Sequence, residues 1–336
     1  MNIASSKTAM DETIVMILVV REICMSFILS GCKNTILFPN DNKKNAMALL
    51  DVLNNNNMSK EKKVILVTGA SSGIGFDAAL ALASHGHRVY AAARRVEKME
   101  PLKSKGIEVI RMDVTDESSM TEGVKTILSK EGRIDVLVNN AGYGFFGAIE
   151  TVPMEEARRQ LEVNVFGLAR LCQLVLPAMR KQGSGRIINT SSVAGRSVLY
   201  FGGWYHVSKY SVEAFSDALR MEMKPFGISV SMIEPGAIKT DWGLIASDHL
   251  RESSSGTPYE HDASRWSKAL RRLYESNLLS KPSVITRQVL RAVESRHPKA
   301  RYRKGRLSGT IVFFHWLLPA RWWDAMMRSA ANFSFQ

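Results

Sequence analysis

Between residues 63 and 233, short apolar runs alternate with stretches long enough to form a helix. Strands that are apolar on both faces are normally covered by helices on both sides, so the pattern predicts buried parallel strands joined by crossover helices. The predicted fold is α/β, a doubly wound parallel sheet of the Rossmann type. The predicted strands are residues 64–67, 89–93, 109–112, 136–138, 186–190 and 229–233.

The chain of 336 residues is long enough for one sizeable domain with an extension. We assign residues 58–336 to a dinucleotide-binding catalytic domain. Within it, the polar segment 241–282 is expected to be a mobile substrate loop, residues 283–294 a helix, and residues 296–336 a basic and aromatic C-terminal extension. Residues 1–57 show no period and end in four asparagines, which indicates a disordered leader or a mis-assigned start. A short accessory helix pair or a targeting element is the rival interpretation.

The net charge of +13 is concentrated after residue 265, where Lys and Arg far outnumber Asp and Glu. Such an excess suits an anionic ligand, a membrane surface or nucleic acid, but no nucleic-acid-binding module accompanies it, so we expect no nucleic-acid partner. Basic residues beside the aromatic stretch 311–327 leave peripheral membrane contact open, with packing over the substrate pocket or another subunit as the favoured alternative.

The three cysteines share no metal-ligand spacing, so we expect no metal and no disulfide framework. A reducing, cytoplasmic location fits this composition. No apolar run approaches the length of a bilayer span. Residues 29–32 (Leu-Ser-Gly-Cys) resemble a lipoprotein cleavage box, so export is the alternative.

A glycine turn follows the first predicted strand and leads into a predicted helix. Gly69 permits a tight turn, Gly73 lets the backbone approach a pyrophosphate, and Gly75 allows close helix packing. The helix N-terminus supplies free N–H groups and a positive dipole end. The turn therefore predicts a dinucleotide site that also includes Ser71, Ser72 and Ile74.

Tyr205 and Lys209 are four residues apart in a stretch with helical periodicity, so both side chains lie on one helix face. A free tyrosine titrates near pH 10. The ammonium of Lys209 together with an oxidised nicotinamide is expected to bring the Tyr205 pKa to roughly 7, which makes it a general acid and base.

These residues resemble the short-chain dehydrogenase/reductase family, whose Gly-x-x-x-Gly-x-Gly turn, Asn-Asn-Ala-Gly element and Tyr-x-x-x-Lys pair all occur here in order. The resemblance covers residues 63–240 and is closest to the steroid and retinol dehydrogenase branch. It implies that Ser192, thirteen residues before Tyr205, orients the substrate oxygen, and that Asn164 holds a water in a proton path. It also implies cofactor contacts from Asp113, Val114, Asn140, Ala141, Gly142, Pro235, Gly236, Ile238 and Thr240, besides Tyr205 and Lys209.

Arg94 and Arg95 follow the second predicted strand, where NAD-binding folds carry an acid. A guanidinium pairs well with a phosphate, so NADP(H) is favoured and NAD(H) remains open. The bland alternative is that both arginines simply face solvent.

The segments that line the substrate pocket in the related family are apolar and aromatic here, which favours a small lipophilic alcohol or its ketone or aldehyde. We also expect a homo-oligomer. An epimerase of the extended branch is disfavoured because its glycine spacing differs, and a non-catalytic NADP-binding regulator would be expected to lose Tyr205 or Lys209. The residues predicted to bind substrate are Ser192, Tyr143, Phe146, Leu199, Trp204 and Trp242.

Overall fold

A seven-stranded parallel sheet forms the centre of the protein in the computed structural model, which describes residues 62–330. The strand order is β3-β2-β1-β4-β5-β6-β7, so the chain starts in the middle, winds to one edge and then to the other. This confirms the predicted doubly wound fold. The prediction for residues 1–57 lies outside the described residues. The strands are β1 (Val64–Thr68), β2 (Arg88–Ala93), β3 (Glu108–Arg111), β4 (Val136–Asn139), β5 (Gly185–Thr190), β6 (Ile228–Pro235) and β7 (Arg301–Lys304).

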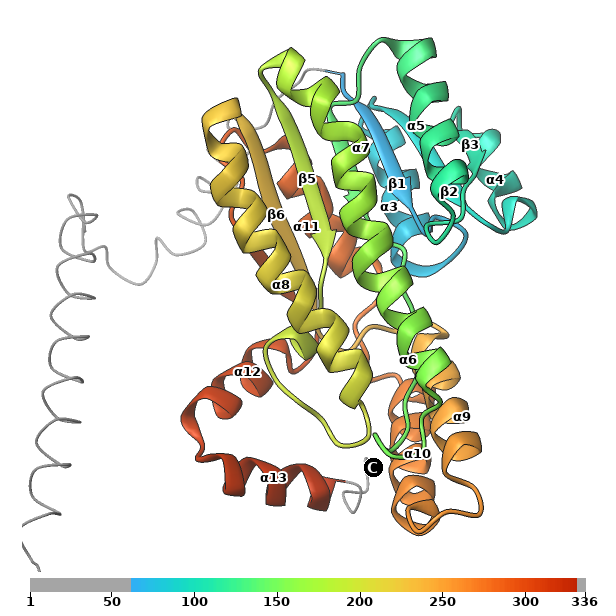
Figure 1. Ribbon diagram of the computed structural model, residues 1–336, viewed down its shortest axis with the longest axis vertical. Helices are drawn as coiled ribbons and strands as arrows, with labels where there is room; N and C mark the ends of the chain where they lie inside the picture. The colour runs from blue at the N-terminus through green and yellow to red at the C-terminus, as the bar shows by residue number, and fades with distance from the viewer. Residues whose placement is uncertain (1–61, 331–336) are drawn as a thin grey trace, which may run out of the picture. The chain divides into compact units, whose positions relative to one another are not determined.

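Helices cover both faces of the sheet (Figure 1). Ile65 and Val67 of β1 pack on one face with α3 and α11, while Val64 and Leu66 pack on the other with α5, α7 and α8. Alternate residues of a single strand thus enter two separate cores, which is why the predicted strands read as continuous apolar runs. The helices around the sheet are α3 (Gly73–Ser84), η2 (Val96–Met99), α4 (Glu100–Lys103), α5 (Glu117–Glu131), α6 (Met154–Leu161), η3 (Glu162–Phe166), α7 (Gly167–Gln182), η4 (Val193–Gly195), α8 (Gly203–Met223), η5 (Lys224–Phe226) and α11 (Ser283–Glu294).

The segment 241–282, predicted to be a mobile loop, is instead a pair of helices, α9 (Trp242–Ser254) and α10 (Glu260–Glu275). The serines of this segment are typical of a loop in the sequence, but several of them are buried contacts between the two helices. Ser247 and Ser267 are buried, and the Ser267 Oγ donates to the Ser247 carbonyl over 2.9 Å. Small polar side chains that bond to a neighbouring backbone let the two helices approach closely.

A seventh strand, β7, lies in the basic segment for which the sequence predicts a C-terminal extension. Strand β7 pairs in parallel with β6, from Met232 opposite Arg301 to Pro235 opposite Lys304. Two short helices follow, α12 (Ser308–Leu317) and α13 (Ala320–Ser329). The described part of the region 296–336 therefore contains one strand and two helices.

One continuous helical run, Met154–Gln182, is long and apolar enough to cross a membrane by length and composition. It comprises α6, η3 and α7. Leu171, Val175 and Met179 of this run are fully buried in the core beside the sheet, so the apolar character serves packing inside the domain.

Candidate active site

The glycine turn after β1 has the geometry that its sequence predicts. Gly69 and Gly73 have φ angles of +65° and +58°, in the left-handed region that favours glycine. A Cβ on Gly75 would lie 2.4 Å from Asn140 Nδ2, so a larger residue could not pack there. The turn is therefore held against the segment that follows β4.

The Asn140-Ala141-Gly142 segment fastens this turn through hydrogen bonds. Thr68 Oγ1 accepts from the backbone N–H groups of Asn140 and Ala141 over 3.0 and 3.1 Å. Asn140 Nδ2 donates to the Thr68 carbonyl over 3.1 Å. The preceding Asn139 is buried and bonds to Asn189 and Cys172, so it supports the core.

Helix α3 begins directly after the turn and presents an open N-terminus. Ser72 occupies the N-cap position, but its side chain makes no capping hydrogen bond. Uncapped N–H groups at the positive end of a helix suit a phosphate. Ile74 packs on the core, and Arg95 Nη2 reaches the Ser71 hydroxyl over 3.3 Å. The residues present thus fit the pyrophosphate of a dinucleotide.

Arg94 is exposed, and within residues 62–330 it makes no hydrogen bond or ion pair. Burial raises the pKa of Tyr143 to about 12, and the positive charge of Arg94 acts in the opposite sense. Arg95, by contrast, is already engaged with Ser71. Arg94 is thus the freer of the two guanidinium groups beside the turn.

The other predicted cofactor residues come from the ends of neighbouring strands. Thr240 approaches the turn closely, since a Cβ on Gly73 would lie 3.4 Å from Thr240 Cγ2. Pro235 ends β6, Gly236 N donates to the Lys304 carbonyl over 2.8 Å, and Ile238 is buried. Asp113 caps its own turn by accepting from Thr115 N, and Val114 packs against Gly167.

Tyr205 and Lys209 lie in the first part of α8, and the structure brings Ser192 to them. Ser192 lies close enough to Tyr205 that its hydroxyl lowers the pKa of the phenol. The Ser192 Oγ also accepts from Ala194 N over 3.1 Å, which makes Ser192 the N-cap of η4. Lys209 Nζ donates to the Thr190 carbonyl over 2.9 Å and lies 5.9 Å from the centre of the Tyr205 ring.

Burial dominates the titration of both groups. It raises the pKa of Tyr205 to about 12 and lowers the pKa of Lys209 to about 8, while the Ser192 hydroxyl and the Glu213 charge act in the opposite senses. The direction for Tyr205 is opposite to the expected one, because the protein alone offers a low dielectric without the positive charge of an oxidised nicotinamide.

Asn164 sits in η3, a π-helical turn that interrupts the run from α6 to α7. Its amide clamps the backbone of Tyr143: Oδ1 accepts from Tyr143 N over 3.0 Å, and Nδ2 donates to the Tyr143 carbonyl over 2.8 Å. Nδ2 also donates to Ser208 Oγ over 3.0 Å. A Cβ on Gly142 would lie 3.0 Å from Asn164 Oδ1 and 3.7 Å from Lys209 Nζ, so all four predicted catalytic residues meet in one place.

Two aromatic rings pack against the ring of Tyr205. The rings of Trp242 and Phe146 lie 4.9 and 5.8 Å from it, between ring centres. Tyr274, which the sequence analysis did not predict, lies tilted against Trp242, with 6.4 Å between the ring centres. Tyr274 lies on α10, in the segment for which the sequence predicts a loop, and only the helix brings it to Trp242.

The remaining predicted substrate residues lie around this cluster. Leu199 N donates to His206 Nε2 over 2.9 Å, so His206 organises the loop and has a structural role. Trp204 is half-buried and, within the described residues, makes no ring contact with Tyr205. Tyr143 OH points to Glu156, 3.5 Å away, with its backbone held by Asn164.

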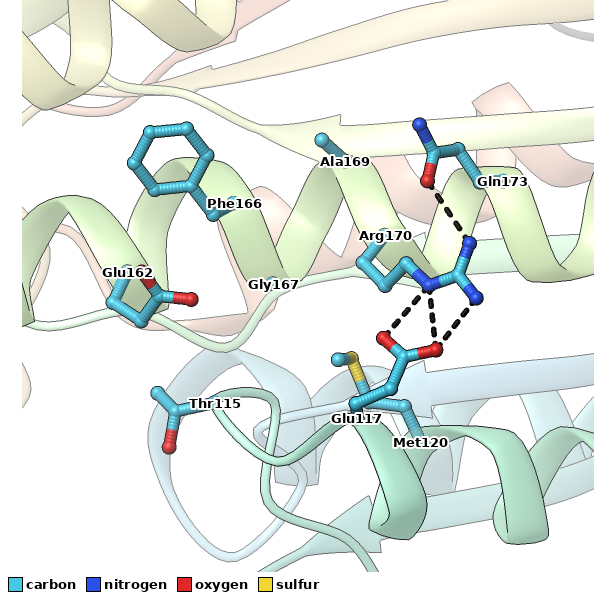
Figure 2. A pocket seen from close by; sticks show the side chains of 9 residues that line it. All are labelled: Thr115, Glu117, Met120, Glu162, Phe166, Gly167, Ala169, Arg170 and Gln173. Atoms are coloured by element: carbon cyan, nitrogen blue, oxygen red, sulfur yellow. Dashed lines mark hydrogen bonds and ion pairs between the residues drawn. The ribbon is translucent and has the colours of Figure 1, made fainter.

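A separate surface pocket of about 330 Å³ lies between the start of α5 and the η3–α7 junction (Figure 2). The Glu117–Arg170 ion pair crosses it, and Phe166 lines its other side. Tyr205, Lys209, Ser192 and Asn164 do not line this pocket.

Comparison with known proteins identifies the family. The profile of the short-chain dehydrogenases matches residues 63–248. A probable short-chain type dehydrogenase/reductase, VdlC, of Helicobacter pylori is 36% identical over 263 residues, which cover 78% of this chain and 96% of that protein. The 17-beta-hydroxysteroid dehydrogenase type 6 of Rattus norvegicus is 37% identical over 263 residues, covering 72% and 80% of the two chains.

Solved structures agree with this assignment. A short-chain dehydrogenase from Streptomyces avermitilis superposes with a TM-score of 0.67 at 31% identity, covering 81% of this chain and 97% of that one. An alcohol dehydrogenase from Thermococcus sibiricus, solved with 5-hydroxy-NADP, has a TM-score of 0.59 at 27% identity and covers 74% and 98%. The glycine turn, the meeting of Tyr205, Ser192, Lys209 and Asn164, and these comparisons lead to one conclusion: the chain is an oxidoreductase of the short-chain dehydrogenase/reductase family.

Proposed function

We propose that this enzyme uses NADP(H) to interconvert a lipophilic primary or secondary alcohol and its aldehyde or ketone. The observation that carries the proposal is the meeting of Tyr205, Ser192 and Lys209 beneath the apolar cover formed by Trp242 and Phe146.

The residues divide the work by position. The Ser192 hydroxyl lies beside Tyr205, from where it is expected to donate to a substrate oxygen. Tyr205 gives a proton to that oxygen in reduction and takes one in oxidation. Lys209 holds its ammonium beside the phenol, and Asn164 fixes the neighbouring backbone of Tyr143. The nicotinamide supplies the hydride when the cofactor is bound.

The free guanidinium of Arg94 supports NADP(H) over NAD(H), because the 2′-phosphate needs a cationic partner where NAD-binding folds place an acid. Structural relatives point the same way: the Thermococcus sibiricus alcohol dehydrogenase was solved with 5-hydroxy-NADP. A metagenomic short-chain oxidoreductase, solved with NADP, is 26% identical to this chain.

The substrate class follows from the wall of the site. Phe146 and Trp242 pack against Tyr205, and Tyr274 packs against Trp242, so the wall is aromatic. Such a wall favours a steroid-like or long-chain compound over a sugar or amino acid. The similarity to a 17-beta-hydroxysteroid dehydrogenase supports the same class. The cytoplasmic location stays a prediction.

The experiment is a panel of hydrophobic alcohols and ketones read by NADPH absorbance, with Tyr205→Phe as the paired variant. We expect at least one substrate to turn over, and Tyr205→Phe to bind NADPH normally while losing about 10²-fold or more in kcat, since general acid–base catalysis is worth roughly 10²–10⁴-fold. A variant that keeps more than about a tenth of the activity is incompatible with that role for Tyr205.

A further inference from the structure

Helices α12 and α13 expose an aromatic surface beside the substrate side of the domain. Figure 1 shows both helices away from the two helical layers of the sheet. Trp316 and Trp322 are 78% and 69% exposed, and Phe313 and Leu317 are each 52% exposed. We call Phe313, Phe314, Trp316, Leu317 and Trp322 the aromatic surface. Large aromatic side chains grouped in this way seldom face water unless they have a partner.

The two helices are nevertheless anchored to the domain. Trp323 is only 4% exposed, and its Nε1 donates to the Val198 carbonyl over 2.8 Å. The His315 ring packs edge-on against Trp323, with 4.9 Å between ring centres. Helix α12 also contacts η4. One side of the pair is therefore bound to the protein while the aromatic surface stays outside.

Basic residues accompany the aromatic surface. Lys304, Arg306, Arg321 and Arg328 are exposed, and none of them forms an ion pair within residues 62–330. Asp324 is the single acidic residue between β7 and the end of α13. Arg321 and Arg328 lie on α13 with the exposed Trp322, so this helix combines uncompensated positive charge with an exposed indole ring.

We propose that this surface binds an anionic phospholipid bilayer peripherally, with Trp316 and Trp322 at headgroup depth. Tryptophan favours the membrane–water interface because its ring is amphipathic, and clustered Lys and Arg are attracted to anionic lipids. A second copy of the chain is a poorer partner, since a symmetric pairing would bring two uncompensated basic clusters together.

The anchoring has a consequence for the substrate. Val198, which holds Trp323, lies in the loop between Ser192 and Tyr205 that borders the catalytic site. A bilayer on the aromatic surface would thus adjoin the site that, under the proposed function, takes a lipophilic compound. The membrane binding itself does not depend on the proposed reaction.

The test is co-sedimentation of the full chain, without cofactor or substrate, with phosphatidylcholine vesicles that contain or lack phosphatidylserine. We expect binding to the phosphatidylserine vesicles at low salt and a loss of at least tenfold at high salt, because the screening length falls from roughly 10 Å at 0.1 M to 3 Å at 1 M. Trp316→Ser combined with Trp322→Ser should weaken binding at least tenfold. The matched control, Met221→Ser combined with Phe226→Ser, replaces residues that are 65% and 42% exposed elsewhere and should bind normally.

No sedimentation at low salt, or equal losses in the two double variants, would overturn the proposal. A smaller oligomer for the tryptophan variant in light scattering, without vesicle binding by the parent, would assign the surface to a second copy. If the tryptophan variant fails to fold by circular dichroism, the unmodified chain decides the matter. Its tryptophan fluorescence should then be quenched by brominated phospholipids, and unchanged fluorescence counts against insertion. Because no turnover is measured, these outcomes leave the proposed reaction untouched.

Discussion

At the scale of single residues, the site of this enzyme is set by burial of groups that normally face water. Lys209 and Tyr205 are 6% and 8% exposed, and burial shifts the pKa of each toward its uncharged form. The protein alone therefore holds a neutral phenol and a weakened ammonium. An oxidised nicotinamide bound beside Tyr205 would add a positive charge in this water-poor site, which would lower the pKa of the phenol.

Replacing Lys209 tests how much the burial of its ammonium lowers the stability of the folded protein. The folded pKa of about 8, against an ordinary value of 10.5, means that folding disfavours the ammonium below pH 8. A shift of this size corresponds to about 3 kcal/mol, which exceeds the roughly 1 kcal/mol expected from the hydrogen bond to Thr190. Lys209→Met should therefore raise Tm at pH 7 in cofactor-free protein.

The sign of the pH dependence follows from proton counting. Between pH 8 and 10.5 the unfolded chain holds the proton that the folded chain has lost, so the parent gains stability as pH rises and the advantage of Lys209→Met shrinks. Thermal melts at pH 7 and pH 10.5 measure this. An advantage that is the same at both pH values would mean that packing, rather than charge burial, is responsible.

Arg94 is the residue on which cofactor choice should depend. Arg94→Asp replaces a free cation by an acceptor for a ribose hydroxyl and repels a 2′-phosphate, so the ratio of kcat/KM for NADP to that for NAD should fall at least tenfold. Steady-state kinetics with both cofactors give the ratio. Arg95→Asp serves as the comparison, and an unchanged ratio in Arg94→Asp would transfer the role to Arg95 or Lys98.

At the scale of secondary-structure elements, β7 shows how a basic sequence becomes part of a sheet. Arg301 Nε lies 3.0 Å from Glu213 Oε2 and 3.1 Å from Glu234 Oε1, and Arg303 Nε lies 2.6 Å from Glu234 Oε2. Glu234 is fully buried, and these two cations compensate the loss of its contact with water. Arg301 and Arg303 thus neutralise carboxylates inside the domain.

Removing one cation of this network should be costly. Arg301→Met leaves Glu213 and Glu234 with fewer partners, and breaking a buried pair typically costs about 3 kcal/mol or more. Arg170→Met is the control, because its partner Glu117 is 59% exposed and such surface pairs contribute roughly 1 kcal/mol or less. Urea unfolding of both variants gives the comparison, and equal losses would show that the network is not effectively buried.

At the scale of the whole molecule, the doubly wound sheet brings together segments from most of the described chain. The glycine turn follows β1, Asn140 follows β4, Ser192 follows β5 and Thr240 follows β6. These strands are parallel neighbours in the order β1-β4-β5-β6, so their carboxyl ends form one edge. That edge is where ligands bind in sheets of this type.

Two adjoining elements carry apolar side chains that are exposed on the surface, and we expect the interface of a homo-oligomer there. Phe166 of η3 and Val207 of α8 are 57% and 46% exposed, and the two elements are in contact. Phe166→Glu combined with Val207→Glu should reduce the mass measured by light scattering, because like charges would meet across a symmetric interface. Ile245→Glu, at a residue 50% exposed on α9, is the control and should leave the mass unchanged. A double variant with the parent's mass would place the interface elsewhere.

The sequence by itself determined the parts that depend on local periodicity. Six strands, the glycine turn, helix α11 and the i, i+4 spacing of Tyr205 and Lys209 all follow from patterns within a few residues, because a strand or helix repeats its burial along its own length. These patterns were sufficient to predict the fold class, whereas the roles of Ser192 and Asn164 came from the resemblance to the family.

Only the tertiary structure decided the parts that depend on distant partners. Strand β7 is basic because Glu234 is buried next to it, and α9 and α10 carry serines because those residues pack against each other. Tyr274 reaches the site only through the fold of α10, and Asn164 clamps Tyr143 through a turn that no helical period indicates. In each case the partner that stabilises the residue lies far away in the sequence, and only folding brings the two together.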